Sequence, residues 1–79
     1  MSREEVLNKI VGYAAMAFQK DAASIREETK IAEELGVASS QRVAMSASIE
    51  NDFDVMIPVA LFGKFETIGD LVDYVIDEM

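Results

Sequence analysis

The stretch TIGDLVDYVIDEM, residues 67–79, carries the clearest secondary-structure signal in this chain of 79 residues. Thr67 with Asp70 three positions later is the pattern in which two side chains satisfy the free amides of a helix's first turn. The apolar residues that follow recur at intervals of three and four, which predicts one apolar helical face. They are Ile68, Leu71, Val72, Val75, Ile76 and Met79.

A second amphipathic helix is predicted near the other end of the chain, from Arg3 to Lys20. Ser2 and Glu5 repeat the capping pattern just before it. Its apolar residues again follow a helical spacing, so they are expected to face the core. They are Leu7, Ile10, Val11, Ala14 and Phe18.

Residues 21–34 show no clear period, and we expect an ordered loop that Ile25 and Ile31 pin onto the core. Gly36 then marks a turn. Ser39 and Ser40 stand where the N-cap of a third helix is needed, and this helix is predicted to run to about Asp52. Its apolar residues form two rows with a spacing of four, Val43 with Ala47, and Met45 with Ile49 and Phe53.

Pro58, the only proline, ends the helical pattern, and residues 59–65 are predicted to form one or two further turns. This apolar stretch is either a partner-binding patch or part of the core. We favour the core for Phe65 and leave Phe62 open. The sequence has no strand alternation and no repeat. It therefore predicts one all-α domain, residues 1–79, in which three main helices and a short one close as a bundle.

The composition limits the classes of partner. Fifteen acidic and seven basic residues give a net charge of -8, which disfavours nucleic acid and anionic membrane surfaces. An acidic surface suits docking onto basic patches of other proteins, although it also simply keeps a small protein soluble. Charge alone leaves both interpretations open.

The chain contains neither cysteine nor histidine. This composition excludes a disulfide framework and a Cys/His zinc site, and no constellation of catalytic side chains is visible, so we do not expect an enzyme. No apolar run approaches the ~20 residues of a membrane span. The charged start, Met-Ser-Arg-Glu-Glu, does not resemble a secretory signal, and we expect a cytoplasmic protein without membrane insertion.

Four stretches, in this order and spacing, resemble the acyl and peptidyl carrier proteins. Residues 25–36 end in Leu-Gly, and residues 37–40 contain a serine at the position that this family modifies. Residues 50–58 read Glu-x-x-Phe-x-x-x-Ile-Pro, and residues 67–75 are similar to the opening of the family's last helix. The resemblance covers the chain from Ile25 to its end.

This resemblance implies that a phosphopantetheinyl transferase attaches 4′-phosphopantetheine covalently to Ser39. Acyl groups would then travel as thioesters on the arm, between acyl-transfer or synthase enzymes of fatty-acid, lipid or polyketide-type biosynthesis. A chain without cysteine would gain its only thiol in this way. The phosphodiester would also sit at a helix N-terminus, where an anion is favoured. A monomer is the simplest expectation.

The match departs from the family around the serine. Ala38 stands where the family usually has aspartate, and Ser40 stands where it has leucine. The third helix also carries little acid before Glu50. These departures favour a specialised carrier with dedicated enzymes. The alternative is a carrier-like protein-interaction module that is not modified, in which Ser39 is only an N-cap.

Overall fold

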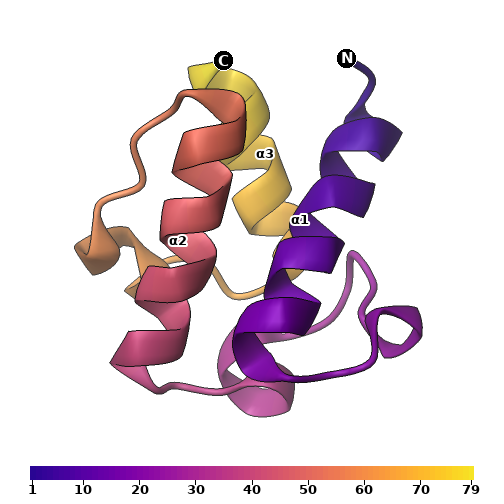
Figure 1. Ribbon diagram of the computed structural model, residues 1–79, viewed down its shortest axis with the longest axis vertical. Helices are drawn as coiled ribbons and strands as arrows, with labels where there is room; N and C mark the ends of the chain where they lie inside the picture. The colour runs from indigo at the N-terminus through magenta and orange to yellow at the C-terminus, as the bar shows by residue number, and fades with distance from the viewer.

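Three α-helices build the molecule: α1 (Arg3–Phe18), α2 (Ser39–Phe53) and α3 (Ile68–Glu78). The computed structural model describes the backbone of residues 1–79 and every side chain except that of Val59. Helix α1 leads away from the end of the bundle that holds both termini, and α2 and α3 lead back towards it (Figure 1). The predicted all-α bundle is confirmed.

Three shorter segments join these helices. Ala22–Ser24 (η1) and Ile31–Leu35 (η2) are single turns within the long connection from α1 to α2, and Val59–Gly63 (η3) lies between α2 and α3. The connection expected as an ordered loop thus contains two short turns. The short helix expected within residues 59–65 is present as η3.

The core takes one apolar stripe from each main helix. Val6, Ile10, Ala14 and Phe18 come from α1, and Met45, Ile49 and Phe53 come from α2; Ile68, Leu71, Val72 and Val75 come from α3. Burying a side chain such as Leu71 fully contributes about 1.5–3 kcal/mol. Both predicted capping boxes are present, Ser2 with Glu5 on α1 and Thr67 with Asp70 on α3.

Of the two apolar rows predicted on α2, only one faces the core. Val43 is 47% exposed and Ala47 is also exposed, whereas Met45, Ile49 and Phe53 are buried. Positions 43 and 45 differ by two residues, which places their rows ~200° apart around a helix. Only one of the two rows can face the core, and the row with the larger side chains does so.

Two smaller corrections concern the helix ends. Ile76 is 39% exposed and Met79 is exposed too, because both lie where α3 and the chain end, at the end of the bundle that holds the two termini (Figure 1). On α1, Leu7 and Val11 are only partly buried, while Val6 lies in the core. That helix ends at Phe18 rather than Lys20.

The long connection is fastened to the start of α3. Ile25 and Ile31 are buried, as predicted. The Ile31 N–H donates to the Glu66 carbonyl (3.0 Å), and the Ile68 N–H donates to the Thr29 carbonyl (3.0 Å). These bonds form an isolated antiparallel bridge that holds η2 against the base of α3.

Gly69 lies where this connection crosses α3. A Cβ atom at this position would meet Glu27 Cγ at 2.8 Å and the Glu27 carbonyl oxygen at 3.2 Å. The Gly69 N–H also donates to that carbonyl (2.9 Å). A larger residue here would therefore force the Glu27 side chain and backbone to shift. Within the described helices, none combines the length and the apolar character needed to cross a membrane.

Candidate functional site: the start of α2 and the adjacent pocket

Ser39 is the first residue of α2, and its side chain is exposed. The chain reaches it from η2 through Gly36, whose φ of 152° is a conformation that L side chains rarely adopt. The start of α2, which Ser39 forms, lies at the end of the bundle opposite both termini (Figure 1). An enzyme can approach the Ser39 hydroxyl without disturbing the core.

The prediction that Ser39 or Ser40 caps α2 is wrong. The N-cap is Ala38, whose backbone is extended and whose carbonyl accepts the first helical bond, from the Arg42 N–H (3.1 Å). Alanine has no oxygen to offer, and α2 has no side-chain cap hydrogen bond. Ser39 therefore does not serve the structure as a helix cap.

An uncapped helix start leaves backbone N–H groups free to bind an anion. The first amides of a helix have no partner within it, and the helix dipole places partial positive charge among them. An anion there gains about 0.3–1 kcal/mol from the dipole at an exposed site. In α1 and α3, by contrast, serine and threonine side chains accept from these amides. Of the three helices, α2 alone presents its first turn uncapped.

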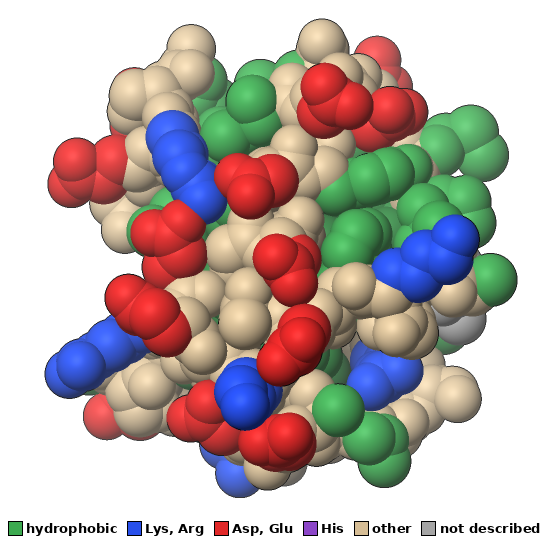
Figure 2. Space-filling view, turned by 180° about the vertical axis from the view of Figure 1, so that it is seen from behind, with side chains coloured by type: hydrophobic (Ala, Val, Ile, Leu, Met, Phe, Trp, Pro, Cys, Tyr) green, Lys and Arg blue, Asp and Glu red, His purple; other side chains and the backbone are tan. Residues whose placement is uncertain are grey.

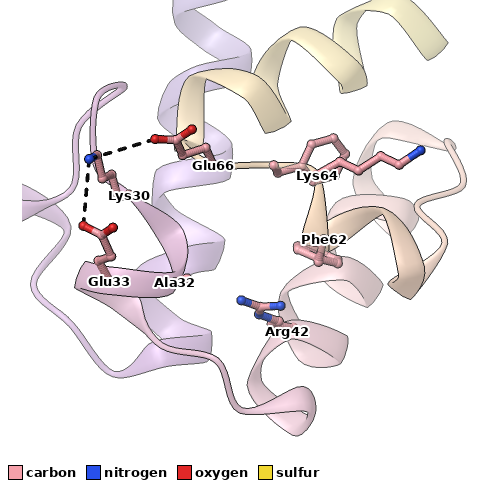
Figure 3. A pocket seen from close by; sticks show the side chains of 9 residues that line it. Lys30, Ala32, Glu33, Arg42, Phe62, Lys64 and Glu66 are labelled. Carbon is pink, nitrogen blue, oxygen red and sulfur yellow. Dashed lines mark ion pairs between the residues drawn. The ribbon is translucent and has the colours of Figure 1, made fainter.

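A pocket of about 310 Å³ lies beside this first turn (Figure 3). Helix α2 contributes Arg42, the η2 side contributes Lys30, Ala32 and Glu33, and the chain from η3 to α3 contributes residues 62–66. The sequence does not decide whether Phe62 belongs to the core or to an exposed patch. In the structure it is buried in the core, at 2% exposure. Phe65, expected in the core, is half-buried against it.

Arg42 is the polar group that points into this pocket (Figure 3). Its Nε atom is buried and has no hydrogen-bond acceptor among the described residues. Lys30 lies 3.9 Å from a carboxylate oxygen of Glu33 and 3.9 Å from one of Glu66. The pocket therefore contains one lysine shared by two carboxylates, and a guanidinium that has no ion-pair partner among the described side chains.

The opposite end of α2 is closed by hydrogen bonds. Glu50 Oε2 accepts from the Ile57 N–H (2.7 Å), and Ser46 Oγ donates to the Ile57 carbonyl (3.2 Å). Tyr74 of α3 donates to the adjacent Met56 carbonyl (2.8 Å). The Glu-x-x-Phe-x-x-x-Ile-Pro stretch thus has a structural role. Its glutamate, Glu50, holds the backbone that turns back after α2, and Phe53 and Ile57 are buried in the core.

Both carboxylates of α2 bond within the molecule. Glu50 holds Ile57, and Asp52 accepts from the Tyr13 hydroxyl (2.5 Å) and pairs with Lys9 (3.4 Å). The Tyr13 hydrogen bond, reinforced by Lys9, lowers the pKa of Asp52, and the same bond raises the pKa of Tyr13. Before Glu50, the exposed positions of α2 carry only uncharged side chains.

The rest of the surface differs from this face. Seen from behind, acidic side chains cover the left and centre of the molecule, whereas apolar side chains gather on the right (Figure 2). Because the molecule is turned by 180°, this side is the left of Figure 1, where α2 and η3 lie. Met56, 77% exposed, follows α2 in the chain. The net charge of -8 is thus unevenly spread around the bundle.

Comparison with known proteins assigns the family. The sequence profile described as phosphopantetheine attachment site matches residues 8–75. An acyl carrier protein of Thermotoga maritima is 31% identical over 74 residues, which covers 94% of this chain and 91% of that protein. One of Lactobacillus acidophilus is 36% identical over 75 residues, with 95% and 94% covered.

This chain belongs to the acyl carrier protein family. Membership implies 4′-phosphopantetheine as its covalently attached cofactor. The start of α2 fits such a group, because it combines an exposed serine hydroxyl with an uncapped first turn. In this acyl carrier protein fold, the adjacent pocket and Arg42 lie next to the arm's expected point of attachment.

Sequence reasoning missed Arg42. The only available signal was its position, because it is the single cation of α2 and lies three residues after the candidate serine. Such a residue looks like part of a solvated face. Its burial depends on η2 and η3 folding over the first turn of α2, which no local pattern reveals.

Proposed function

We propose that this chain carries acyl groups on a 4′-phosphopantetheine arm attached to Ser39. The observation that carries this proposal is the uncapped first turn of α2, where an exposed serine has no structural role as a cap. Family membership supports it independently. We further propose that the protein acts in the cytoplasm as a monomer, the simplest state for an acidic bundle of this size.

Attachment requires little of the protein beyond presenting Ser39. The serine oxygen forms a bond to the phosphorus of the arm, the pyrophosphate bond of coenzyme A breaks, and the nucleotide half leaves. The hydroxyl proton is lost in the same exchange. The free amides of α2 would favour the negative charge of a phosphodiester on Ser39. When bound, the cofactor supplies a thiol that holds acyl groups as thioesters.

Intact mass spectrometry tests this proposal. The chain is co-expressed with a phosphopantetheinyl transferase of broad specificity, beside Ser39→Ala and the matched control Ser40→Ala. We expect one phosphopantetheine arm on the wild type and on Ser40→Ala, and none on Ser39→Ala. An unmodified wild type, even with a transferase from the same organism, would instead support the interaction module without a cofactor.

We also propose that this is a specialised carrier with dedicated enzymes. Standard acidic docking onto basic patches needs free carboxylates on the helix beside the arm. Both carboxylates of α2 already bond within the molecule, and Arg42 adds a positive charge. The exposed residues Ala44 and Ala47 occupy positions on this face where acid could be introduced.

Binding to enzymes that serve ordinary carriers tests this specialisation. We expect the wild type to bind a basic-surfaced synthase component more weakly than an ordinary acidic carrier does, with little dependence on salt. The double variant Ala44→Glu/Ala47→Glu should bind more tightly and lose that gain at high salt. Wild-type affinity equal to that of an ordinary carrier would contradict the proposal.

A further inference from the structure

The pocket beside Ser39 combines an apolar wall with one unmet hydrogen-bond donor. Phe62 and Phe65 meet edge to face, with ring centroids 5.7 Å apart, and Ala32 lies on the η2 side. Its volume of about 310 Å³ is at the lower end of pockets that bind small molecules, ~300–1,000 Å³. The space therefore suits a short chain rather than a long one.

The donor is Arg42. Buried N–H groups in native proteins nearly always have an acceptor, so a buried Nε without one indicates that an acceptor is missing. The guanidinium points into the pocket, whereas the head of Lys64 points away from it (Figure 3). A guanidinium presents donors in a planar fork that matches a carboxylate.

The acids that line the pocket do not satisfy Arg42. Glu33 and Glu66 both pair with Lys30, and no ion pair joins either of them to Arg42 among the described side chains. Lys30 offsets one of the two negative charges that these acids would direct at an incoming anion, and the Arg42 guanidinium offsets the other. The pocket thus favours one carboxylate, placed at Arg42.

Arg42 lies within reach of the arm. It follows Ser39 by three residues on α2, and residues at this spacing are neighbours on a helix surface, with Cβ atoms about 5–6 Å apart. A flexible arm that begins at Ser39 starts beside the pocket and can fold back into it. Its cargo, at the far end of the arm, can then enter between Phe62 and Arg42.

We propose that this pocket binds the distal end of a short acyl group that ends in a carboxylate, and that Arg42 selects this cargo. The inference rests on the proposed attachment at Ser39. It names the cargo as a short dicarboxylic acyl group. A plain saturated chain of the same length would leave the Arg42 donor without a partner.

The test compares two cargoes of equal carbon number. A broad-specificity transferase loads the chain from glutaryl- or pentanoyl-coenzyme A, and intact mass confirms each product before any further measurement. A failure to load would refute the proposed function itself, and it is recognised at this step. Once loading is confirmed, the later results report only on the pocket.

The readouts are the ¹⁵N NMR resonance of Arg42 Nε–H, assigned with Arg42→Lys, and the thermal midpoint of each loaded form. We expect the glutaryl form to shift this resonance and to slow its proton exchange relative to the pentanoyl and unloaded forms. The glutaryl form should also melt higher than the pentanoyl form. Arg42→Met, which keeps the apolar stem, should remove that difference in midpoint.

Three results would overturn the proposal. The resonance could stay unchanged in the glutaryl form, or pentanoyl cargo could shift it equally. It could also shift fully in the unloaded form with its arm, in which case the phosphodiester would be the acceptor of Arg42. Each of these results removes the role of Arg42 in selecting a carboxylated cargo.

Discussion

The two ends of α2 treat their polar groups in opposite ways. At its C-terminal end, Glu50, Ser46 and Tyr74 satisfy the backbone of the returning chain at Ile57 and Met56. At its N-terminal end, the cap is an alanine and the first turn has no side-chain cap, and Arg42 Nε is buried without an acceptor among the described residues. The first end uses its hydrogen-bonding groups to stabilise the fold, whereas the protein leaves several of those at the second end unused.

The largest loss of stability is expected from removing the hydrogen bond between Glu50 and Ile57 at the C-terminal end of α2. Glu50→Ala leaves the Ile57 N–H without its acceptor, and we expect a cost of about 1–3 kcal/mol in the free energy of unfolding, measured by urea denaturation. Glu50→Gln keeps an acceptor oxygen and should lose much less. Equal losses in the two variants would show that the bond itself does not hold the turn.

Two serines of α2 sharpen the comparison on a single helix. Ser46→Ala removes a buried donor to the Ile57 carbonyl and should cost about 1 kcal/mol while leaving phosphopantetheinylation intact. Ser39→Ala should change the free energy of unfolding by less than about 0.5 kcal/mol and abolish modification. Urea denaturation and intact mass, measured on both variants, separate the two roles. A large destabilisation by Ser39→Ala would contradict the account.

A residue at position 38 that can cap α2 should stabilise the N-terminal end of this helix. Ala38→Asp and Ala38→Asn both place an acceptor at the N-cap of α2, and each should stabilise the protein by about 1 kcal/mol in thermal or urea unfolding. Only aspartate restores the acid that the family usually has before its serine. We therefore expect faster modification by the transferase for Ala38→Asp than for Ala38→Asn. Equal rates would show that this acid is not needed.

The smallest expected effect is a change in how stability depends on pH in the acidic range. The pKa of Asp52 is lowered in the folded state, chiefly by the Tyr13 hydrogen bond, so its contribution is complete above the unfolded pKa. This contribution is lost as the pH falls through the folded pKa. Tyr13→Phe should raise the pKa of Asp52 in an NMR titration. The variant's loss of stability relative to wild type should therefore shrink as the pH falls through that range.

A second tyrosine provides the control for this pH dependence. Tyr74→Phe removes a hydroxyl that bonds a carbonyl rather than a carboxylate. Its loss of stability should stay constant over the same acidic range. A pH-independent loss for Tyr13→Phe, matching that of Tyr74→Phe, would contradict the assigned cause of the Asp52 shift.

The sequence predicted those features that depend on local spacing. The capping boxes at Ser2 and Thr67 follow from residues three apart, and the buried stripe of α3 follows from a period of 3.6. The row of α2 that faces the core was not decided by spacing, because two rows competed. The structure selects the row of Met45 over that of Val43.

The features that sequence reasoning missed depend on chain segments that meet only in the fold. Two good cap residues, Ser39 and Ser40, suggested the N-cap, yet the approach of the chain through Gly36 makes Ala38 the flanking residue. The bond from Glu50 to Ile57 depends on the chain turning back after α2. Arg42 becomes a candidate ligand-binding residue only when η2 and η3 enclose it.

The most direct test of the account is to locate the arm on the modified chain. Trypsin cleaves after Lys30 and Arg42 and releases residues 31–42, which contain both candidate serines. Tandem mass spectrometry of this peptide should place the phosphopantetheine on Ser39 alone. An arm on Ser40, or a peptide that remains unmodified after treatment with an active transferase, would contradict the claim that the open end of α2 presents Ser39 for modification.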